Sequence, residues 1–302
     1  MIGKRGGVGL RAGARSGPRG EAGRNDVSVT MSTVWDRTTD CLSERRAAML
    51  PIVLLGLLVP LALIGTLMPL MGSSGHGGDL LLGIIVLLLS LLTSWAGLAL
   101  TALALDPAIS RVAAVQAANR RFLPVLGIGL VTLAVVVVLA MPIGIVLGLS
   151  GMNMAALAAG TLQPGDVNGG AMAFVSLYSL VLAVVLFWAY ARCVVLVTPI
   201  VLEERLGLGV YRRSFDLTRH IAWKVIGVVM LYGVVSWVAS AAAKSVFGTV
   251  FALVLGGEGT VTLASILTQV VVAGVSTLFS LLAVVFLAKL YLAAREAIVA
   301  RS

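Results

Sequence analysis

Long apolar runs without a charged side chain dominate the hydropathy pattern of the chain. Six runs contain no Asp, Glu, Lys or Arg: 47–78, 80–105, 122–165, 167–191, 225–243 and 259–288. A helix needs about 20 predominantly apolar residues to cross roughly 30 Å of hydrocarbon. The third run exceeds one span, but its end is polar and Gly-rich, so we expect one helix and a loop there. The pattern predicts an all-α, polytopic transmembrane helix bundle with six spans: 48–71, 80–105, 122–149, 171–202, 223–247 and 260–297.

Three shorter segments outside these spans have the periodicity of amphipathic helices. In the leader 31–47, one helical face collects Val34, Thr38, Cys41 and Leu42, while Asp36, Asp40 and Glu44 lie elsewhere. Segment 106–121 opens with Asp106-Pro107, a typical helix start, and its apolar face would be Ile109, Val112, Ala113 and Ala117. Segment 203–224 can turn four residues toward apolar surroundings: Val210, Ser214, Leu217 and Ile221. We expect these segments to form short helices at the cytoplasmic membrane surface.

The first thirty residues differ in kind from the rest of the chain. They hold eight Gly and six Lys or Arg and almost no large apolar side chain, so they cannot bury enough surface to fold. Two interpretations stay open for 1–30: a disordered basic tail that contacts lipid, or sequence upstream of a translation start at Met31. The predicted organisation is thus 1–30 as this tail, 31–47 as an amphipathic juxtamembrane helix and 48–302 as the transmembrane domain.

Composition and charge support a membrane protein and set its orientation. The chain is 59% hydrophobic and only 12% charged, too few charges to cover a water-soluble surface of this size. Twenty of the 22 Lys and Arg residues fall in the four segments on one predicted side of the membrane. By the positive-inside rule both termini are cytoplasmic, in a multi-pass protein of the bacterial inner (plasma) membrane. The net charge of +9 then indicates contact with anionic lipid headgroups as partners, and no nucleic acid.

The sequence offers little material for catalysis, cofactors or metals. There are two Cys and two His, and neither His76 nor His220 has a partner at metal-ligand or triad spacing. No phosphate loop and no G-x-S-x-G motif is present. We therefore expect no enzyme activity, no cofactor and no metal site.

Arg192 is the one charged residue inside the predicted span 171–202. It falls near the inner boundary of span four, where a dry guanidinium is costly and should pair or reach the interface. Glu203 and Glu204 lie eleven and twelve residues downstream, about 16–18 Å away if the helix continues through Pro199. We expect the 203–224 segment to fold back so that Asp216 approaches Arg192. The alternative for Arg192 is a solute or lipid-phosphate site.

The region after Arg192 resembles a known bacterial membrane family. The residues that carry the resemblance are Arg192, Thr198-Pro199, Glu203, Arg213-Ser214-Phe215-Asp216-Leu217-Thr218 and Trp223-Lys224. This pattern is similar to the membrane domain of glycerophosphoryl diester phosphodiesterases. The acidic and His residues of that family's catalytic domain are absent, so the resemblance implies a membrane module without the phosphodiesterase activity.

Two functional hypotheses follow for this membrane protein. The first is a non-enzymatic membrane module or scaffold for a possible protein partner, and the alternative is a passive transporter or lipid-handling protein. The candidate structural or ligand contacts are Arg192, Pro199, Glu203, Arg213, Ser214, Asp216 and Thr218.

Overall fold

A computed structural model describes residues 31–71, 75–151, 169–191, 198, 202, 209–218, 222–256 and 261–299. Almost all of these residues are helical, and none of them lies in a strand. Six helical stretches are long and apolar enough to cross a membrane: Met31–Leu70, Gly77–Leu105, Arg111–Leu149, Gly169–Ala189, Trp223–Leu255 and Leu263–Ala297. The predicted all-α class is therefore confirmed for the described residues, which provide six helical stretches that could serve as the predicted spans.

The leader and the first span form one continuous helical stretch. It consists of α1 (Met31–Val53), the π-helical turn η1 (Leu54–Leu58), α2 (Val59–Leu67) and the 3-10 turn η2 (Met68–Leu70). Pro51 precedes η1 and Pro60 follows it, and each removes a backbone donor from the regular ladder. A π turn is one way in which a helix accommodates such a disturbance without ending.

The second and third spans are α3 (Gly75–Leu105) and α4 (Arg111–Leu149). The expected separate helix over 106–121 is wrong, because its residues from Arg111 onward continue directly into the third span. Ser110, whose side chain accepts from the Ala113 N–H, is the N-cap. The predicted face is confirmed only in part: Ile109 and Ala117 pack against a hydrophobic core, but Val112 is 64% exposed, and Ala114 and Ala118 are buried. These alanines belong to one hydrophobic core with α3, so this segment packs on a neighbouring helix.

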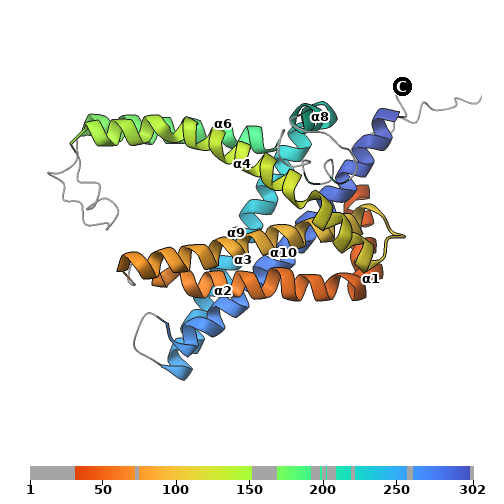
Figure 1. Ribbon diagram of the computed structural model, residues 1–302, viewed down its shortest axis with the longest axis horizontal. Helices are drawn as coiled ribbons and strands as arrows, with labels where there is room; N and C mark the ends of the chain where they lie inside the picture. Colours follow the sequence, from red (N-terminus) through yellow and green to blue (C-terminus); the bar gives the residue numbers. More distant parts are fainter. Residues whose placement is uncertain are drawn as a thin grey trace, which may run out of the picture.

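The second half of the described chain contains α6 (Gly169–Ala189), α8 (Gly209–Thr218), α9 (Ala222–Leu255) and α10 (Leu263–Val299). Helix α10 packs against α1, α2, α3 and α9 and is the centre of the molecule (Figure 1). Helices α4 and α6 lie side by side and extend away from this body as a hairpin (Figure 1). None of the residues of α6 is buried.

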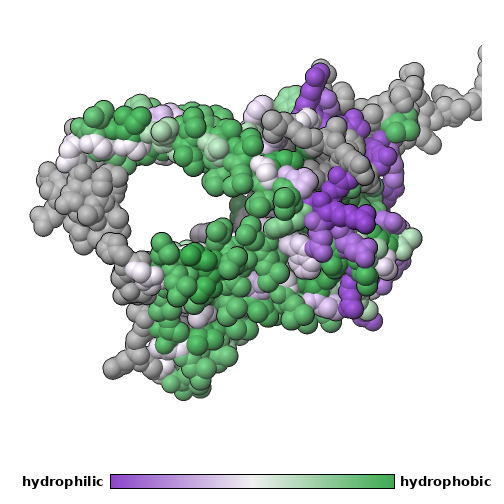
Figure 2. All heavy atoms as spheres, in the orientation of Figure 1, coloured by the Kyte–Doolittle hydropathy of each residue, from purple (hydrophilic) through white to green (hydrophobic). Residues whose placement is uncertain are grey.

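Polar residues gather at one end of the molecule, and apolar residues cover the remainder (Figure 2). The polar end is where α1 begins, α3 ends and α4 begins (Figures 1 and 2). Figure 2 also shows an open space, bordered by apolar residues, between the α4–α6 hairpin and the body. This distribution is typical of a multi-pass membrane protein, whose apolar helix surfaces are solvated by lipid.

Candidate functional site: an apolar pocket beside α8

The site residues predicted from the sequence fall into two groups. Arg192, Pro199 and Glu203 lie outside the described residues, as does Glu204. The expected approach of Asp216 to Arg192 therefore stays a prediction. The other four candidates, Arg213, Ser214, Asp216 and Thr218, all lie on helix α8.

Helix α8 has one buried face, and it is the face that the sequence pattern predicts. Val210 and Ser214 are fully buried and Leu217 is 4% exposed, whereas Asp216 is exposed. The Nε atom of Arg213 is also buried, although its residue is partly exposed. The expected fourth member of this face, Ile221, lies outside the described residues, and α8 ends at Thr218.

Contacts to four other helices hold α8 in place. Val210 and Leu217 share a hydrophobic cluster with Val225 of α9 and with Leu290 and Tyr291 of α10. On another side, the Tyr211 hydroxyl lies 2.7 Å from Thr132 Oγ1 and 3.0 Å from the Ile128 carbonyl oxygen of α4. Phe215 meets Trp188, near the end of α6, edge to face at 6.5 Å between ring centroids. Helix α8 thereby joins the α4–α6 hairpin to α9 and α10.

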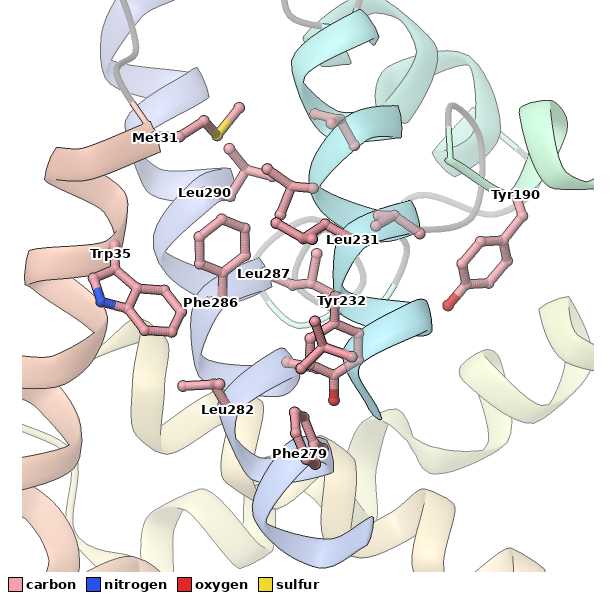
Figure 3. Close-up of a pocket in the computed structure, with 15 residues that line it drawn as sticks. Met31, Trp35, Tyr190, Leu231, Tyr232, Phe279, Leu282, Phe286, Leu287 and Leu290 are labelled. Carbon is pink, nitrogen blue, oxygen red and sulfur yellow. The ribbon is translucent and has the colours of Figure 1, made fainter. Parts of the chain in front are cut away.

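Next to α8, a pocket of about 410 Å³ opens between α1, α9 and α10 (Figure 3). Its lining comes from α1, α9, α10 and one tyrosine beyond α6: Met31, Trp35, Tyr190, Val225, Val228, Val229, Leu231, Tyr232, Val235, Phe279, Leu282, Ala283, Phe286, Leu287 and Leu290. Val225 and Leu290 are shared with the α8 cluster, so this end of the pocket adjoins α8.

Aromatic rings shape the pocket wall. The rings of Tyr232 in α9 and Phe279 in α10 meet edge to face, with 5.8 Å between their centroids. The ring centroids of Trp35 in α1 and Phe286 in α10 lie 6.4 Å apart. Tyr190 faces the pocket from the opposite side (Figure 3). Almost all of the lining is aliphatic or aromatic, with two phenol hydroxyls and one indole N–H as polar groups. Such a wall binds hydrocarbon through burial of apolar surface and offers a ligand a few hydrogen-bonding groups.

Sequence reasoning did not single out this pocket, although α10 carries a signal for it. Phe279, Ala283, Phe286 and Leu290 recur at i, i+4, i+7 and i+11, which places them on one helical face. In a helix that is apolar on all sides, no polar face lies opposite to mark this face as the one that lines a pocket. The pocket becomes visible only when the neighbouring helices are in place.

No group of three or more His, Cys, Asp or Glu residues that could hold a metal ion occurs within the described ranges. The pocket between α1, α9 and α10 is a candidate site for an apolar ligand.

Comparison with known proteins gives a family but no characterised relative. No curated protein and no solved structure gives a significant match. Residues 37–294, which include nearly all of the described helices, match a family described as a domain of unknown function. The chain belongs to this family, DUF7847.

Proposed function

We propose that this protein is a non-enzymatic, multi-pass protein of the bacterial inner membrane that binds a lipid acyl chain in the pocket between α1, α9 and α10. The observation that carries the proposal is the apolar, aromatic-lined pocket of about 410 Å³ within helices that are long and apolar enough to span a membrane. A pocket of this size and composition suits an apolar ligand, and acyl chains are the apolar molecules that surround such helices.

The length of the pocket supports an acyl chain as the ligand. Along α9 the lining extends from Val225 to Val235, ten residues or about 15 Å at 1.5 Å per residue. The hydrocarbon core of a bilayer is about 30 Å thick, so the pocket covers the depth of roughly one leaflet. It starts beside α8 at the polar end, where a headgroup would remain at the membrane surface.

The proposed orientation places the polar end in the cytoplasm. The Lys and Arg residues of the leader, of the α3–α4 connection and of α8 support this orientation through the positive-inside rule. Helix α8 is then a short amphipathic helix at the inner surface, with Val210, Ser214 and Leu217 directed inward. The sequence resemblance to the membrane domain of glycerophosphoryl diester phosphodiesterases supports the same kind of module.

A scaffold for a partner protein is the second candidate, and helix α6 favours it. This helix buries none of its residues within the chain and is apolar throughout its length. A partner's transmembrane helix could therefore pack on it. Passive transport has less support, since the pocket wall is apolar and provides no polar path for a solute.

The acyl-chain proposal is tested by filling the pocket. Ala283 lines it, and Ala283→Phe would place a ring in the space of the chain. We expect the wild-type protein, extracted from native membranes in mild detergent, to retain phospholipid in native mass spectrometry. The variant should retain severalfold less lipid while folding normally.

Ala134→Phe is the matched control, because Ala134 is exposed on the apolar part of α4 and away from the pocket. It should keep wild-type lipid retention. Equal retention by all three proteins would contradict the proposal and favour the scaffold, which predicts co-purification of a membrane protein instead.

A further inference from the structure

A second recess, separate from the acyl-chain pocket, opens at the start of the apolar part of α4. Its volume is about 450 Å³, and among the described residues it is lined by Ala117, Arg120, Arg121 and Leu202. Two adjacent guanidinium groups thus face one space together with two apolar side chains. This mixture of basic and apolar lining differs from the uncharged, predominantly apolar pocket of α9 and α10.

The two arginines lie at the level where the chain enters the apolar layer. Arg121 immediately precedes Phe122, the first residue of an uncharged run that lasts through the end of α4. A guanidinium at this boundary lies at the depth of lipid phosphates rather than in bulk water or in hydrocarbon.

This part of α4 is fixed in position by contacts with α3. The Trp95 indole N–H donates to Asn119 Oδ1 at 2.6 Å, one residue before the arginine pair. Ala114 and Ala118 are fully buried in the core that α4 shares with α3. The backbone that carries the two guanidinium groups is therefore preorganised, which lowers the entropic cost of binding an anion.

Among the described residues, no carboxylate balances the charge of the pair. Within the described part of the chain, no carboxylate forms an ion pair with Arg120 or Arg121. Arg121 is partly buried, so its charge loses some hydration without gaining a described anionic partner. A phosphate would compensate this charge, since guanidinium forks bind phosphate oxygens in pairs.

We propose that this recess binds the phosphate of an anionic phospholipid, with Arg120 and Arg121 as its ligands and the apolar lining against the start of the acyl region. The site should prefer lipids with a net negative headgroup. The two guanidinium groups attract the phosphate and repel the ammonium of a zwitterionic headgroup. No carboxylate in the described lining would attract that ammonium. The proposal is independent of the acyl-chain pocket, because the described linings of the two sites have no residue in common.

The test measures binding of defined lipids to the full chain in detergent by native mass spectrometry, after delipidation. Phosphatidylglycerol and phosphatidylcholine with the same acyl chains are titrated separately, and inorganic phosphate is added as a competitor. We expect wild-type protein to bind phosphatidylglycerol more tightly than phosphatidylcholine. The double variant Arg120→Gln/Arg121→Gln should weaken the phosphatidylglycerol complex by roughly tenfold or more, because each basic residue contributes about 1 kcal/mol to the attraction of anionic lipid.

Arg111→Gln is the matched control, since Arg111 is an exposed arginine in the first turn of the same helix. It should leave binding of phosphatidylglycerol within about twofold of wild type. Arg121→Lys should recover only part of the affinity, because an ammonium group cannot form the paired contact.

Three results would overturn the proposal. Equal binding of the two lipids by the wild-type protein would contradict the headgroup preference, and this comparison needs no variant. If Arg111→Gln weakened phosphatidylglycerol binding as much as the double variant does, the loss would be a general effect of surface charge. Displacement of phosphatidylglycerol by millimolar inorganic phosphate would assign the site to the free anion instead of a lipid.

Discussion

Arg45 illustrates how a single side chain can complete the end of a neighbouring helix. From α1 its guanidinium donates to the carbonyl oxygens of Leu103 and Asp106 at 2.8 Å and of Ile109 at 2.6 Å. Lys289 of α10 donates to the Ala104 carbonyl oxygen at 2.8 Å. The last carbonyls of a helix have no partner within it, and cations are favoured there by the helix dipole. Two cations from two other helices thus satisfy the end of α3.

We predict that Arg45→Met destabilises the protein by roughly 1–3 kcal/mol, because it leaves partly buried carbonyl oxygens without a donor. Thermal unfolding in detergent should show a midpoint lower by several degrees. Arg46→Met is the control, since Arg46 is exposed and neighbours Arg45 in the chain. Equal midpoints for the two variants would mean that the three hydrogen bonds contribute nothing to stability.

At the scale of elements, α3 packs closely against the first span at the π turn η1. A Cβ atom added at Gly56 would overlap the Cβ atom of Ala96, at a separation that non-bonded carbon atoms do not adopt. Ala96 is itself fully buried. The absence of a side chain at position 56 therefore permits this close packing, as small residues do between membrane helices.

We expect Gly56→Ala to force η1 and α3 apart and to lower the unfolding midpoint. Adding Ala96→Gly to this variant should restore much of the loss, because the second change removes the other atom of the clash. Gly97→Ala is the control, since nothing lies within 4 Å of a Cβ atom there, and this helical position should be neutral or slightly stabilised. Failure of the double variant to recover any stability would contradict this account of the packing.

Element faces were predictable from the sequence where polar and apolar residues alternate. The leader buries Val34, Thr38 and Cys41 as predicted, and α8 buries the predicted face with Ser214. Element ends were harder to predict, because they were placed at charged residues. Helix α3 starts at Gly75, so Asp79 lies within it and does not mark its beginning. Helix α9 continues to Leu255, eight residues beyond the predicted end of its span at residue 247.

The pocket could not be predicted in the same way. It depends on which faces of α1, α9 and α10 meet, and helices that are apolar all round do not encode this choice in their periodicity. Pairings such as Trp35 with Phe286 join residues about 250 positions apart. The recess at Arg120 and Arg121 is an intermediate case, because the sequence marks the basic pair but not the space beside it.

At the scale of the whole molecule, the separation of polar and apolar surface predicts the topology. Reporters fused after Ser74 and after Gly165 should be periplasmic, and a reporter after Leu217 should be cytoplasmic. The physical reason is the excess of Lys and Arg on the side of the leader, the α3–α4 connection and α8. Alkaline phosphatase and fluorescent protein fusions at each position would give complementary signals. An inverted signal at any of the three positions would break the six-span arrangement.

The position of α10 has a consequence for biosynthesis. Helix α10, the last helix among the described residues, packs against α1, α2 and α3, and Glu296 forms a 3.0 Å ion pair with Arg37 of the leader. A ribosome releases α10 only after the spans that precede it have been made, so the first two spans must wait in the lipid without their principal partner. Until then Lys289 is missing from the end of α3, and Arg45 alone caps it. The first two spans therefore complete their packing only after α10 has been inserted, and a chain truncated before Leu263 would lack the helix at the centre of the molecule.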